Sequence, residues 1–459
     1  MLPFSRSLAR VAVRDLPYEA VGGRLRAWLM QPRSAGLVSH GNRFGRYSYL
    51  MTEPDAVAVL PYEAAEDVAT LLRAATAFIG ADRGAAPFSG GLIGMASFEL
   101  GLRLENMKRR PFRMEGGDAW PELVLMRFPA TLAFDHAEQR LMAIGRGETM
   151  AEAEAAAGRI AATWEETPVS APVSEPLCDA PLRLETPDGV HEDKVAALVR
   201  QIHAGDLFQA NLARGWSGRL REGITPGDVM AGLHTAGAAP FGGFLRLDHR
   251  AIASNSPERF IRLTDGLMET RPIKGTRPRG PDATTDAALS ADLLNSAKDR
   301  AENLMIVDLM RHDLSKVAVT GSVTVPELNA LESYANVHHL VSSVTARLAP
   351  GRTAVDVLAA TFPPGSISGA PKVQAMKVIS EMEAARGPYC GSLFYVDVTG
   401  DMDASVLIRT VVMEEQASRW HLRACAGGGI VADSDPFAER IETETKLSLI
   451  RRVLEGQPV

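Results

Sequence analysis

The sequence predicts an α+β protein with strands in both halves of the chain. Short apolar stretches bounded by turn residues occupy residues 10–60 and 123–134, and similar stretches occupy residues 206–214, 244–262 and 422–431. Between these stretches, apolar residues recur at every third or fourth position, which is typical of one face of a helix. At 459 residues, the chain has room for two domains or for one large domain with a sizeable core.

Helices are predicted in the first half by apolar spacing and by composition. Residues 66–79 carry apolar side chains at helical spacing, namely Val68, Leu71, Leu72 and Ala75. A second helical piece is expected near Phe98, after the glycine-rich run at residues 90–94. Residues 151–164 are rich in alanine and glutamate, which are strong helix formers.

The second half has the same mixture of elements. An amphipathic helix is predicted to end at Gly205, because its apolar residues have helical spacing: Val195, Leu198, Val199 and Ile202. Further helices are expected at residues 302–310 and 438–454, and residues 384–398 indicate a turn that leads into a strand.

A proline- and serine-rich stretch, residues 168–176, separates the two halves and is typical of a linker or an exposed crossover. The sequence contains no internal repeat. We therefore expect an N-terminal region at residues 1–165, a linker at residues 166–185 and a C-terminal domain at residues 186–459.

The composition argues against several classes of partner. Lys and Arg total 49 against 56 Asp and Glu, and the resulting net charge of −7 does not favour nucleic acid. No apolar run has the length that a membrane span needs. The three cysteines, Cys178, Cys390 and Cys425, share no metal-site spacing and cannot form a disulfide framework, which fits a reducing compartment. We therefore expect a cytoplasmic protein without a nucleic acid or membrane partner.

The segment from Arg271 to Gly280 contains four cations, two glycines and two prolines, so it suits neither a helix interior nor a plain strand. Within it, Lys274 lies between an isoleucine and a glycine. Desolvation and neighbouring positive charge both favour the neutral amine, which is the form in which a lysine acts as a nucleophile. The same cations would attract an anionic substrate. From these residues alone, a basic surface turn remains the alternative.

Two predicted helices carry glutamates that suit a divalent cation. Glu439, Glu442 and Lys446 share one face of the last helix, and Glu302 lies near the start of another. Carboxylates without histidine or cysteine partners suit Mg²⁺, which keeps waters and takes further ligands from its substrate. On spacing alone, solvated helix faces or salt bridges are the commoner explanation.

Two glycine-containing loops and one histidine complete the set of candidates. The run Gly427–Gly429 would let backbone N–H groups approach an anion, although a bulge or turn at a strand end is the alternative. The loop at residues 363–371 adds the hydroxyls of Ser366 and Ser368. His339 is either a proton carrier or a buried core histidine.

Taken together, these segments resemble the chorismate-utilising enzymes, which include anthranilate synthase component I, aminodeoxychorismate synthase component I, isochorismate synthase and salicylate synthase. The matching blocks follow one another through the second half: Gly205–Arg214, Ser256–Phe260, Lys274–Arg277, Glu302–Asp308, Val337–Val341, Gly365–Lys372, Arg386–Gly391, Ile408–Arg409, Gly427–Gly429 and Glu439–Lys446. The first half resembles the family more loosely, at Leu37–Ser39 and Gly45–Ser48. The resemblance implies an α+β fold of large antiparallel sheets packed as a sandwich, with helices outside and a core shared by both halves.

Within this family, Lys274 favours the aminodeoxychorismate synthase branch. The resemblance implies lysine at this position in that branch and alanine in the anthranilate, isochorismate and salicylate synthases. Gln209 agrees, because members that use water carry a lysine base there. The resemblance therefore implies amination of chorismate to 4-amino-4-deoxychorismate, for 4-aminobenzoate and folate biosynthesis, with Mg²⁺ as cofactor.

The resemblance also implies roles for individual residues. Lys274 would attack C2 of chorismate, Glu258 would protonate the departing C4 hydroxyl, and His339 would shuttle protons. Glu302 and Glu442 would hold Mg²⁺, with Glu439 beside them. Substrate binding is expected at Gly275, Thr276, Ser366, Tyr389, Arg409, Gly427, Gly428, Gly429 and Lys446.

No glutaminase motif accompanies these residues, because Cys390 lies in Pro-Tyr-Cys-Gly rather than in a nucleophile elbow. The resemblance thus implies a separate glutamine amidotransferase subunit that supplies ammonia, in a heterodimer. Ser39 and Pro240 fall where the family's tryptophan pocket would lie. Two alternatives stay open, namely an anthranilate or isochorismate type of enzyme and a silent chorismate-binding subunit.

The sequence departs from the family pattern at Arg311-His312-Asp313, where the family more usually has Arg-Asn-Asp. This departure lies a helical turn or more beyond Glu302. We therefore expect altered packing there rather than loss of metal binding.

Overall fold

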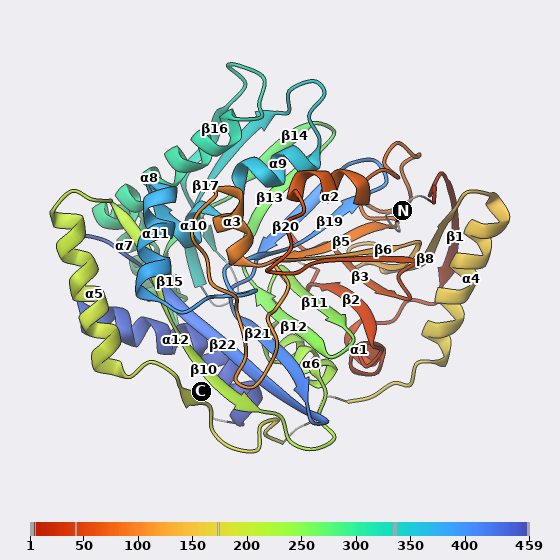
Figure 1. The fold of residues 1–459 in the computed structure, drawn as a ribbon, viewed down its shortest axis with the longest axis horizontal. Helices are drawn as coiled ribbons and strands as arrows, with labels where there is room; N and C mark the ends of the chain where they lie inside the picture. Colours follow the sequence, from red (N-terminus) through yellow and green to blue (C-terminus); the bar gives the residue numbers. More distant parts are fainter. Residues whose placement is uncertain are drawn as a thin grey trace.

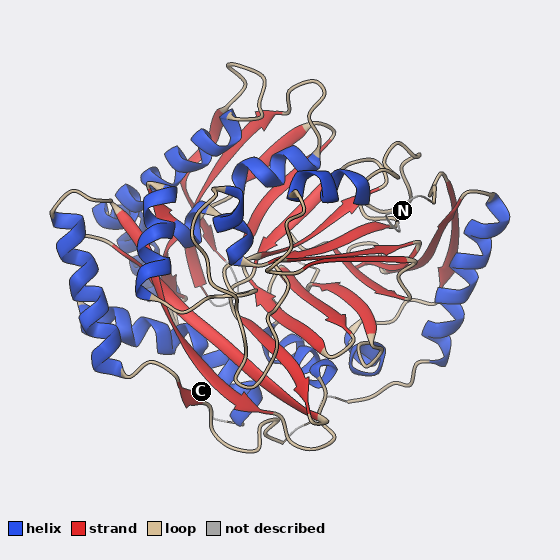
Figure 2. Ribbon diagram, viewed as in Figure 1, coloured by secondary structure: helices blue, strands red, loops and turns tan. Residues whose placement is uncertain are grey.

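The computed structural model describes residues 4, 6–41, 44–171, 173, 175–333 and 337–456. Two large antiparallel sheets dominate the fold, and helices cover their outer faces (Figures 1 and 2). This arrangement confirms the predicted α+β sandwich.

The first sheet has twelve strands. Their order is β1 (Arg10–Leu16), β8 (Arg140–Gly147), β7 (Ala130–Asp135), β3 (Tyr47–Thr52), β2 (Arg33–Val38), β11 (Phe241–Leu247), β12 (Arg250–Ser256), β21 (Thr410–Gln416), β22 (Arg419–Ile430), β10 (Gln209–Arg219) and β18 (Gly369–Ala370), with β9 (Arg183–Leu184) paired to β10.

The second sheet has ten strands. Their order is β15 (Ile273–Pro278), β17 (Val337–Arg347), β14 (Leu267–Thr270), β13 (Arg259–Thr264), β20 (Met402–Val406), β19 (Ser392–Asp397), β5 (Gly91–Ala96), β6 (Leu123–Phe128) and β4 (Ala56–Leu60), with β16 (Thr324–Ser333) paired to β17.

The helices are α1 (Gly22–Trp28), α2 (Val68–Ala75), α3 (Phe98–Leu104), α4 (Met150–Glu166), α5 (Asp188–His203), α6 (Pro226–Gly237), α7 (Ala283–Asn295), α8 (Ala297–Ser315), α9 (Ala354–Thr361), α10 (Gly365–Ser368), α11 (Lys372–Met382) and α12 (Pro436–Glu455). Helices α1, α4, α6 and α12 contribute to one core cluster with the first sheet, whereas α2, α8, α9 and α11 contribute to another with the second sheet. No helix in the described ranges is both long and apolar enough to cross a membrane.

The two sheets pack against each other through a third core cluster. Along β5, Ile93 and Met95 belong to this central cluster, whereas Leu92 and Ala96 belong to the cluster beneath the outer helices. Because successive strand residues point to opposite faces, both faces of β5 are buried. This double burial explains why its sequence is apolar throughout instead of alternating with polar residues.

Both halves of the chain contribute neighbouring strands to each sheet. Strand β2 pairs with β11 in the first sheet, and β5 pairs with β19 in the second. The predicted linker at residues 166–185 includes β9, which pairs with β10. The domain boundaries themselves stay a prediction, whereas the shared core is present in the structure.

Candidate active site

Lys274 lies on β15, at the edge of the second sheet, where the strand bulges. Lys274 pairs with Leu340 of β17, and Thr276 pairs with His339, the neighbour of Leu340. Gly275 therefore has no partner on β17 and is the extra residue of a β-bulge. Gly275 has a φ of 76°, and a Cβ there would approach Leu293 to 2.8 Å. Glycine is therefore required at this point of the strand.

The arginines that flank Lys274 in sequence do not explain its chemistry. Arg271, Arg277 and Arg279 each pair with carboxylates, at 2.6–2.7 Å in their shortest ion pairs. Burial is the main cause that lowers the pKa of Lys274, and the nearby Lys446 ammonium lowers it further. The positive charge that assists the neutral amine therefore comes from α12 and not from the basic segment itself.

Three carboxylates near Lys274 oppose this effect and raise its pKa: Glu302, Glu258 and Glu442. They come from α8, from the turn between β12 and β13, and from α12. The fold thus brings these predicted residues together around one amine. Because burial outweighs the carboxylates, the net change still favours the uncharged, nucleophilic form.

Glu258 is buried, and its backbone is fixed on both sides. Its N–H donates to Ser256 Oγ at 3.2 Å, and its carbonyl accepts from the N–H of Val406 at 3.1 Å. Burial raises the pKa of the Glu258 carboxyl, whereas a hydrogen bond with the Ser366 side chain lowers it. A raised pKa favours the protonated carboxylic acid, which is the form that can act as a proton donor.

The carboxylates on α8 and α12 form a second part of the site. Burial raises the pKa of Glu302, and the charge of Glu442 raises it further. Glu442 forms an ion pair with Lys446 at 2.6 Å, and the Lys446 ammonium also donates to the Gly427 carbonyl at 2.9 Å. Lys298 lies 4.0 Å from Glu302.

Glu439 has a feature that favours a cation. Its side chain is buried, its Oε1 accepts a hydrogen bond from Ser434 at 2.6 Å, and its Oε2 is buried without a hydrogen-bond partner among the described residues. A buried carboxylate oxygen without a partner is costly unless a cation compensates for it. The described residues contain no group of three or more His, Cys, Asp or Glu arranged to hold a metal. An ion held by these glutamates would thus need water and substrate oxygens as its further ligands, which is typical of a hard divalent ion.

The glycine run Gly427–Gly429 is part of a strand and not a turn. It pairs with Ala213, Leu212 and Asn211 of β10, whereas pairing with β21 extends only as far as Ala424. The edge on the β21 side is thus open at the glycines, so backbone N–H groups are available to a ligand there. A Cβ at Gly428 would lie 2.8 Å from Glu439 Oε2, and one at Gly429 would lie 2.7 Å from Gln209 Nε2.

His339, Thr276 and Arg409 lie together on another wall. The Thr276 hydroxyl is 2.9 Å from His339 Nδ1, and burial, with the charge of Arg409, lowers the pKa of His339 to about 4. The imidazole is therefore neutral at physiological pH. Arg409 has a φ of 50° and an exposed side chain, and its carbonyl accepts from the N–H of Asn255 at 3.0 Å.

Tyr389 occupies a different position from these residues. It is buried, and the groups that act electrostatically on its phenol are Cys390, Arg386, Cys425 and Glu383. No hydrogen bond in the described part of the chain joins its phenol to Lys274 or Glu258. The loop that carries Tyr389 nevertheless contacts the site through Arg386, which donates to the carbonyls of Ile367 and Asn211.

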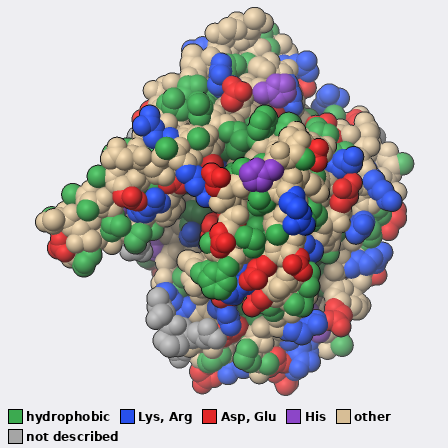
Figure 3. Space-filling view, turned by 90° about the vertical axis from the view of Figure 1, so that its left-hand side faces the viewer, with side chains coloured by type: hydrophobic (Ala, Val, Ile, Leu, Met, Phe, Trp, Pro, Cys, Tyr) green, Lys and Arg blue, Asp and Glu red, His purple; other side chains and the backbone are tan. Residues whose placement is uncertain are grey.

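The molecular surface is hollowed on the face that carries α5, α7 and α12, and basic and acidic side chains gather beside the hollow (Figure 3). Several predicted site residues are partly or fully exposed, including Thr276, Arg409, Glu442 and Lys446. Arg409, Glu442 and Lys446 are thus accessible to a charged ligand.

Ser39 and Pro240 line one cavity of about 320 Å³. The Ser39 N–H donates to Ser48 Oγ at 3.0 Å, and its hydroxyl donates to the Gly45 carbonyl. Aromatic side chains and charged groups share the lining: Phe44, Tyr47, Tyr49, Phe241, Tyr395, Arg46, Arg83, Arg259, Arg262, Asp401 and Asp403.

The departure at Arg311-His312-Asp313 lies near the C-terminal end of α8, whereas Glu302 lies in its first half. His312 is exposed, whereas Asp313 is buried and forms ion pairs with Lys372 and, at 3.1 Å, with Lys316. Lys372 also donates to the Thr361 carbonyl at 2.6 Å. This segment therefore joins α8 to α9 and α11, and its histidine makes no contact with the carboxylates of the site in the described chain.

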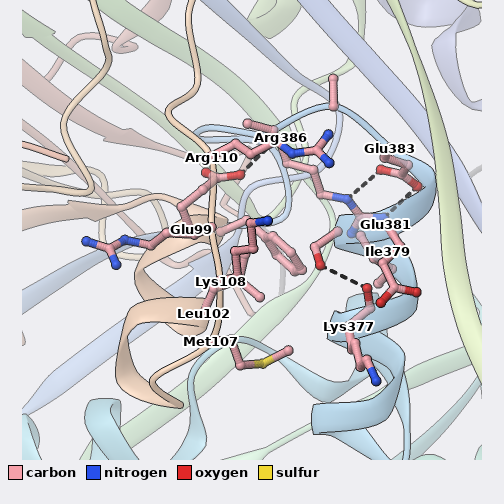
Figure 4. Close-up of a pocket in the computed structure, with 15 residues that line it drawn as sticks. Glu99, Leu102, Met107, Lys108, Arg110, Lys377, Ile379, Glu381, Glu383 and Arg386 are labelled. Carbon is pink, nitrogen blue, oxygen red and sulfur yellow. Dashed lines mark hydrogen bonds and ion pairs between the residues drawn. The ribbon is translucent and has the colours of Figure 1, made fainter. Parts of the chain in front are cut away.

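Sequence reasoning missed Glu99 and assigned no role to Arg386. Both line a cavity of about 470 Å³ that includes none of the predicted catalytic residues (Figure 4). The available signal was a single carboxylate within the otherwise apolar run Phe98–Leu102, where a buried charge requires a specific partner.

The chain was compared with known proteins by family model, by sequence and by structure. A family model described as chorismate binding enzyme matches residues 41–452. Aminodeoxychorismate synthase component 1 of Klebsiella aerogenes is 41% identical over 377 residues, which cover 81% of this chain and 78% of that protein. Aminodeoxychorismate synthase component 1 of Escherichia coli K12 is 40% identical over 372 residues, covering 80% and 78%.

Solved structures agree with these sequence matches. Anthranilate synthase component I from Streptococcus pneumoniae superimposes with a TM-score of 0.75 at 28% identity, covering 88% of this chain and 92% of that one. The menaquinone-specific isochorismate synthase from Escherichia coli has a TM-score of 0.72 at 18% identity, covering 98% and 96%, and therefore supports the fold alone. The family model and the sequence relatives each cover most of the chain, and we conclude that it belongs to the chorismate binding enzyme family.

Proposed function

We propose that this chain converts chorismate and ammonia to 4-amino-4-deoxychorismate and water. Two relatives with about four-fifths coverage bear the name aminodeoxychorismate synthase component 1. The observation that carries the proposal is the position of Lys274, a desolvated amine beside the protonatable Glu258. The product would serve 4-aminobenzoate and folate biosynthesis.

Lys274 begins the reaction as a nucleophile. Its neutral amine forms a bond to C2 of chorismate, the ring double bond shifts, and the bond between C4 and its hydroxyl oxygen breaks. Glu258 donates a proton to that oxygen, so the hydroxyl leaves as water. Ammonia then forms a bond to C4, the double bond shifts back, and the C2–N bond breaks to return the Lys274 amine. The new ammonium at C4 gives one proton to the Glu258 carboxylate, which restores the acid. The enolpyruvyl group stays in place throughout.

The remaining residues bind the substrate and its charges. Arg409 and the backbone N–H groups of Gly427–Gly429 suit one carboxylate of chorismate, and Gly275, Ser366 and Tyr389 lie in segments that border the site. The Thr276 hydroxyl orients the neutral imidazole of His339, which can accept and return a proton. The Lys446 ammonium contacts both the Glu442 carboxylate and the Gly427 carbonyl, where it balances negative charge.

We propose Mg²⁺ as the cofactor, held by Glu302 and Glu442 with Glu439 beside them. Bound there, the ion would neutralise the second carboxylate of chorismate. The buried, unpartnered Glu439 Oε2 and the mutual repulsion of Glu302 and Glu442 support a cation at this point.

The ammonia source is proposed to be a glutamine amidotransferase subunit in a heterodimer with this chain. The relatives' designation as component 1 supports a partner component. Within the described chain, the three cysteines are buried and burial raises the pKa of each thiol, so none is suited to serve as a glutaminase nucleophile. Free thiols also support a cytoplasmic location.

The cavity at Ser39 and Pro240 is proposed to take tryptophan. Its aromatic lining suits an indole, and its arginine and aspartate side chains suit the carboxylate and ammonium of a free amino acid.

The test uses purified protein with chorismate, Mg²⁺ and excess ammonium at mildly alkaline pH. We expect 4-amino-4-deoxychorismate from the wild type, and Lys274→Ala should lower the rate by about 10³-fold or more because the nucleophile is lost. Lys377→Ala, at an exposed lysine outside the site, is the matched control and should retain the wild-type rate.

Product identity decides between the candidate functions. Anthranilate or a hydroxylated product would contradict amination. Chorismate binding without turnover, even after the amidotransferase subunit is added, would favour the silent subunit. Equal rates for Lys274→Ala and wild type would remove the covalent step from the mechanism.

A further inference from the structure

A carboxylate from the first half of the chain anchors a loop of the second half. Glu99 lies in the first turn of α3 and is only 3% exposed. One of its oxygens accepts the N–H of Arg386 at 2.7 Å, and the other accepts the N–H of Gly387 at 2.9 Å. The Phe98 N–H donates to the Gly387 carbonyl at 2.8 Å, so three hydrogen bonds join α3 to this loop.

The anchored loop has a backbone that needs external support. Gly387 has a φ of 62°, and Cys390 has a φ of 63° although it carries a side chain. A Cβ at Gly387 would lie 2.4 Å from Phe112, so the loop is also closely packed. Backbone in this left-handed region costs free energy and persists where surrounding contacts determine it.

The same loop directs a guanidinium toward the active site. Arg386 is 3% exposed and forms two hydrogen bonds with Glu383, at 2.9 and 3.0 Å (Figure 4). Its remaining donors reach the carbonyl of Ile367 at 3.3 Å and that of Asn211 at 2.9 Å. The guanidinium is planar and forked, so Arg386 contacts all of these partners at the same time.

Both carbonyls belong to residues that are linked directly to Ser366. Ile367 follows Ser366 directly in α10, and the Asn211 side-chain amide donates to the Ser366 carbonyl at 3.1 Å. The Ser366 side chain in turn forms the hydrogen bond that lowers the pKa of Glu258. A continuous set of contacts therefore leads from Glu99 through Arg386 to the proton donor.

We infer that Glu99 is a positioning residue for the reaction: by fixing the Arg386 loop, it holds Ser366 in the place from which Ser366 orients Glu258. This inference rests on the proposed function, because it concerns the same acid. Glu99 lies outside the substrate site and touches neither Lys274 nor Glu258. Its effect on the rate is transmitted through a hydrogen-bonded network whose misplacement by a fraction of an ångström is costly.

The experiment measures chorismate consumption with ammonium and Mg²⁺ for Glu99→Gln, Ser366→Ala and the double variant. Glutamine replaces one acceptor oxygen by a donor, so one loop N–H loses its partner. We expect kcat to fall about tenfold or more for Glu99→Gln, with a change in KM for chorismate below about threefold. Glu381→Gln, at an exposed glutamate lining the same cavity, should match the wild type.

The double variant distinguishes positioning from general destabilisation. If Glu99 acts through Ser366, the double variant should be no slower than Ser366→Ala alone, because both changes interrupt one path. The inference would be overturned if the double variant lost kcat by the product of the two single-variant losses. It would also be overturned if Glu99→Gln had the same kcat as Glu381→Gln. Where Glu99→Gln does not fold, judged by circular dichroism, Arg386→Lys tests the same path, and retained kcat in that variant would also overturn it.

Failure of the proposed function gives a different signal. Anthranilate or a hydroxylated product from the wild type would contradict amination, whereas the ratio of chorismate consumption rates among these variants would still decide the role of Glu99.

Discussion

At the scale of single residues, the site depends on charges held away from water. Lys274 and Glu258 are shifted in the directions that their proposed roles require, one toward the neutral amine and the other toward the neutral acid. Each is opposed by the other's charge, so burial has to exceed the attraction between them. Such burial costs folding free energy, and it is typical of sites where titratable groups serve chemistry near neutral pH.

Glu99 offers a measurable example of this cost. Burial raises its pKa from an ordinary value of 4.5 to about 7, although Arg386 and two backbone N–H groups oppose the change. An acid whose pKa is raised by folding stabilises the protein below its unfolded pKa and loses that contribution as the pH rises through the folded value. Relative to Glu99→Gln, the wild-type free energy of unfolding should fall by about 3 kcal/mol between pH 4 and pH 8.

Urea unfolding of the two proteins across this pH range checks the prediction. Glu381→Gln serves as the control, because it makes the same substitution at an exposed glutamate. A wild-type curve parallel to that of Glu99→Gln would show that Glu99 titrates normally.

Gly428 gives a second prediction at this scale. Gly428→Ala places a methyl group 2.8 Å from Glu439 Oε2 within a paired strand, so the carboxylate has to move. The Mg²⁺ concentration for half-maximal activity should rise about tenfold, as for other changes next to a metal ligand. Gly158→Ala, in α4 with nothing within 4 Å of the new Cβ, should leave it unchanged. If both variants needed the same Mg²⁺ concentration for half-maximal activity, Glu439 would not contribute to Mg²⁺ binding.

At the scale of elements, α12 carries Glu439 and Glu442, and capping residues fix the ends of this helix. Asp435 accepts the N–H of Ala438 at 2.8 Å, Pro436 occupies the first turn, and Gly456 ends the helix with a φ of 67°. These are the residue types that favour helix starts and ends. The position of Glu439 and Glu442 therefore depends on where this helix begins.

Asp435→Ala should lower the free energy of unfolding by about 1 kcal/mol because the cap is lost. Asp433→Ala, at a neighbouring exposed aspartate outside the cap, should change it by less than about 0.5 kcal/mol. Denaturant titration of both variants provides the measurement. Equal stabilities would mean that the α12 start is fixed by packing alone.

The sequence predicted this element well and others poorly. Apolar spacing and composition located α2, α4, α5, α8 and α12. Helices α9 and α11 were not predicted. Most of α9 is buried, so its apolar residues do not form a single stripe. In α11, Ala375, Met376 and Ile379 are buried at helical spacing, so this signal was present in the sequence and was overlooked. Likewise, periodicity indicated strands in both halves, but their order in the sheets follows from pairing between distant segments and required the family resemblance.

The same reason limits what could be predicted of the site. Lys274, Glu302 and Glu442 were found as motifs because each chemical signal is local in sequence. Glu99 and Arg386 were missed as a pair because they are separated by 287 residues and each is unremarkable in its own segment. A buried carboxylate in an apolar helix signals that a partner exists but not which one.

At the scale of the whole molecule, the shared sheets make the two halves depend on each other. Residues 186–459 expressed alone should fail to fold cooperatively, because β11 and β19 would each lose a neighbouring strand. Two fragments divided within residues 166–185 and expressed together should associate, since that segment contributes only the short β9 to the sheets. Circular dichroism and gel filtration of the fragments, alone and together, check both outcomes; a folded, monomeric C-terminal fragment would contradict the first.

The pairing of β2 with β11 also has a consequence for how the protein is made. About 200 residues of chain separate these strands, and at the usual speed of translation β11 leaves the ribosome about 10 to 40 s after β2. During that interval the apolar β2 edge has no partner from the second half. Until β11 arrives, this edge is able to pair with another newly synthesised chain, and a holding chaperone would prevent that pairing.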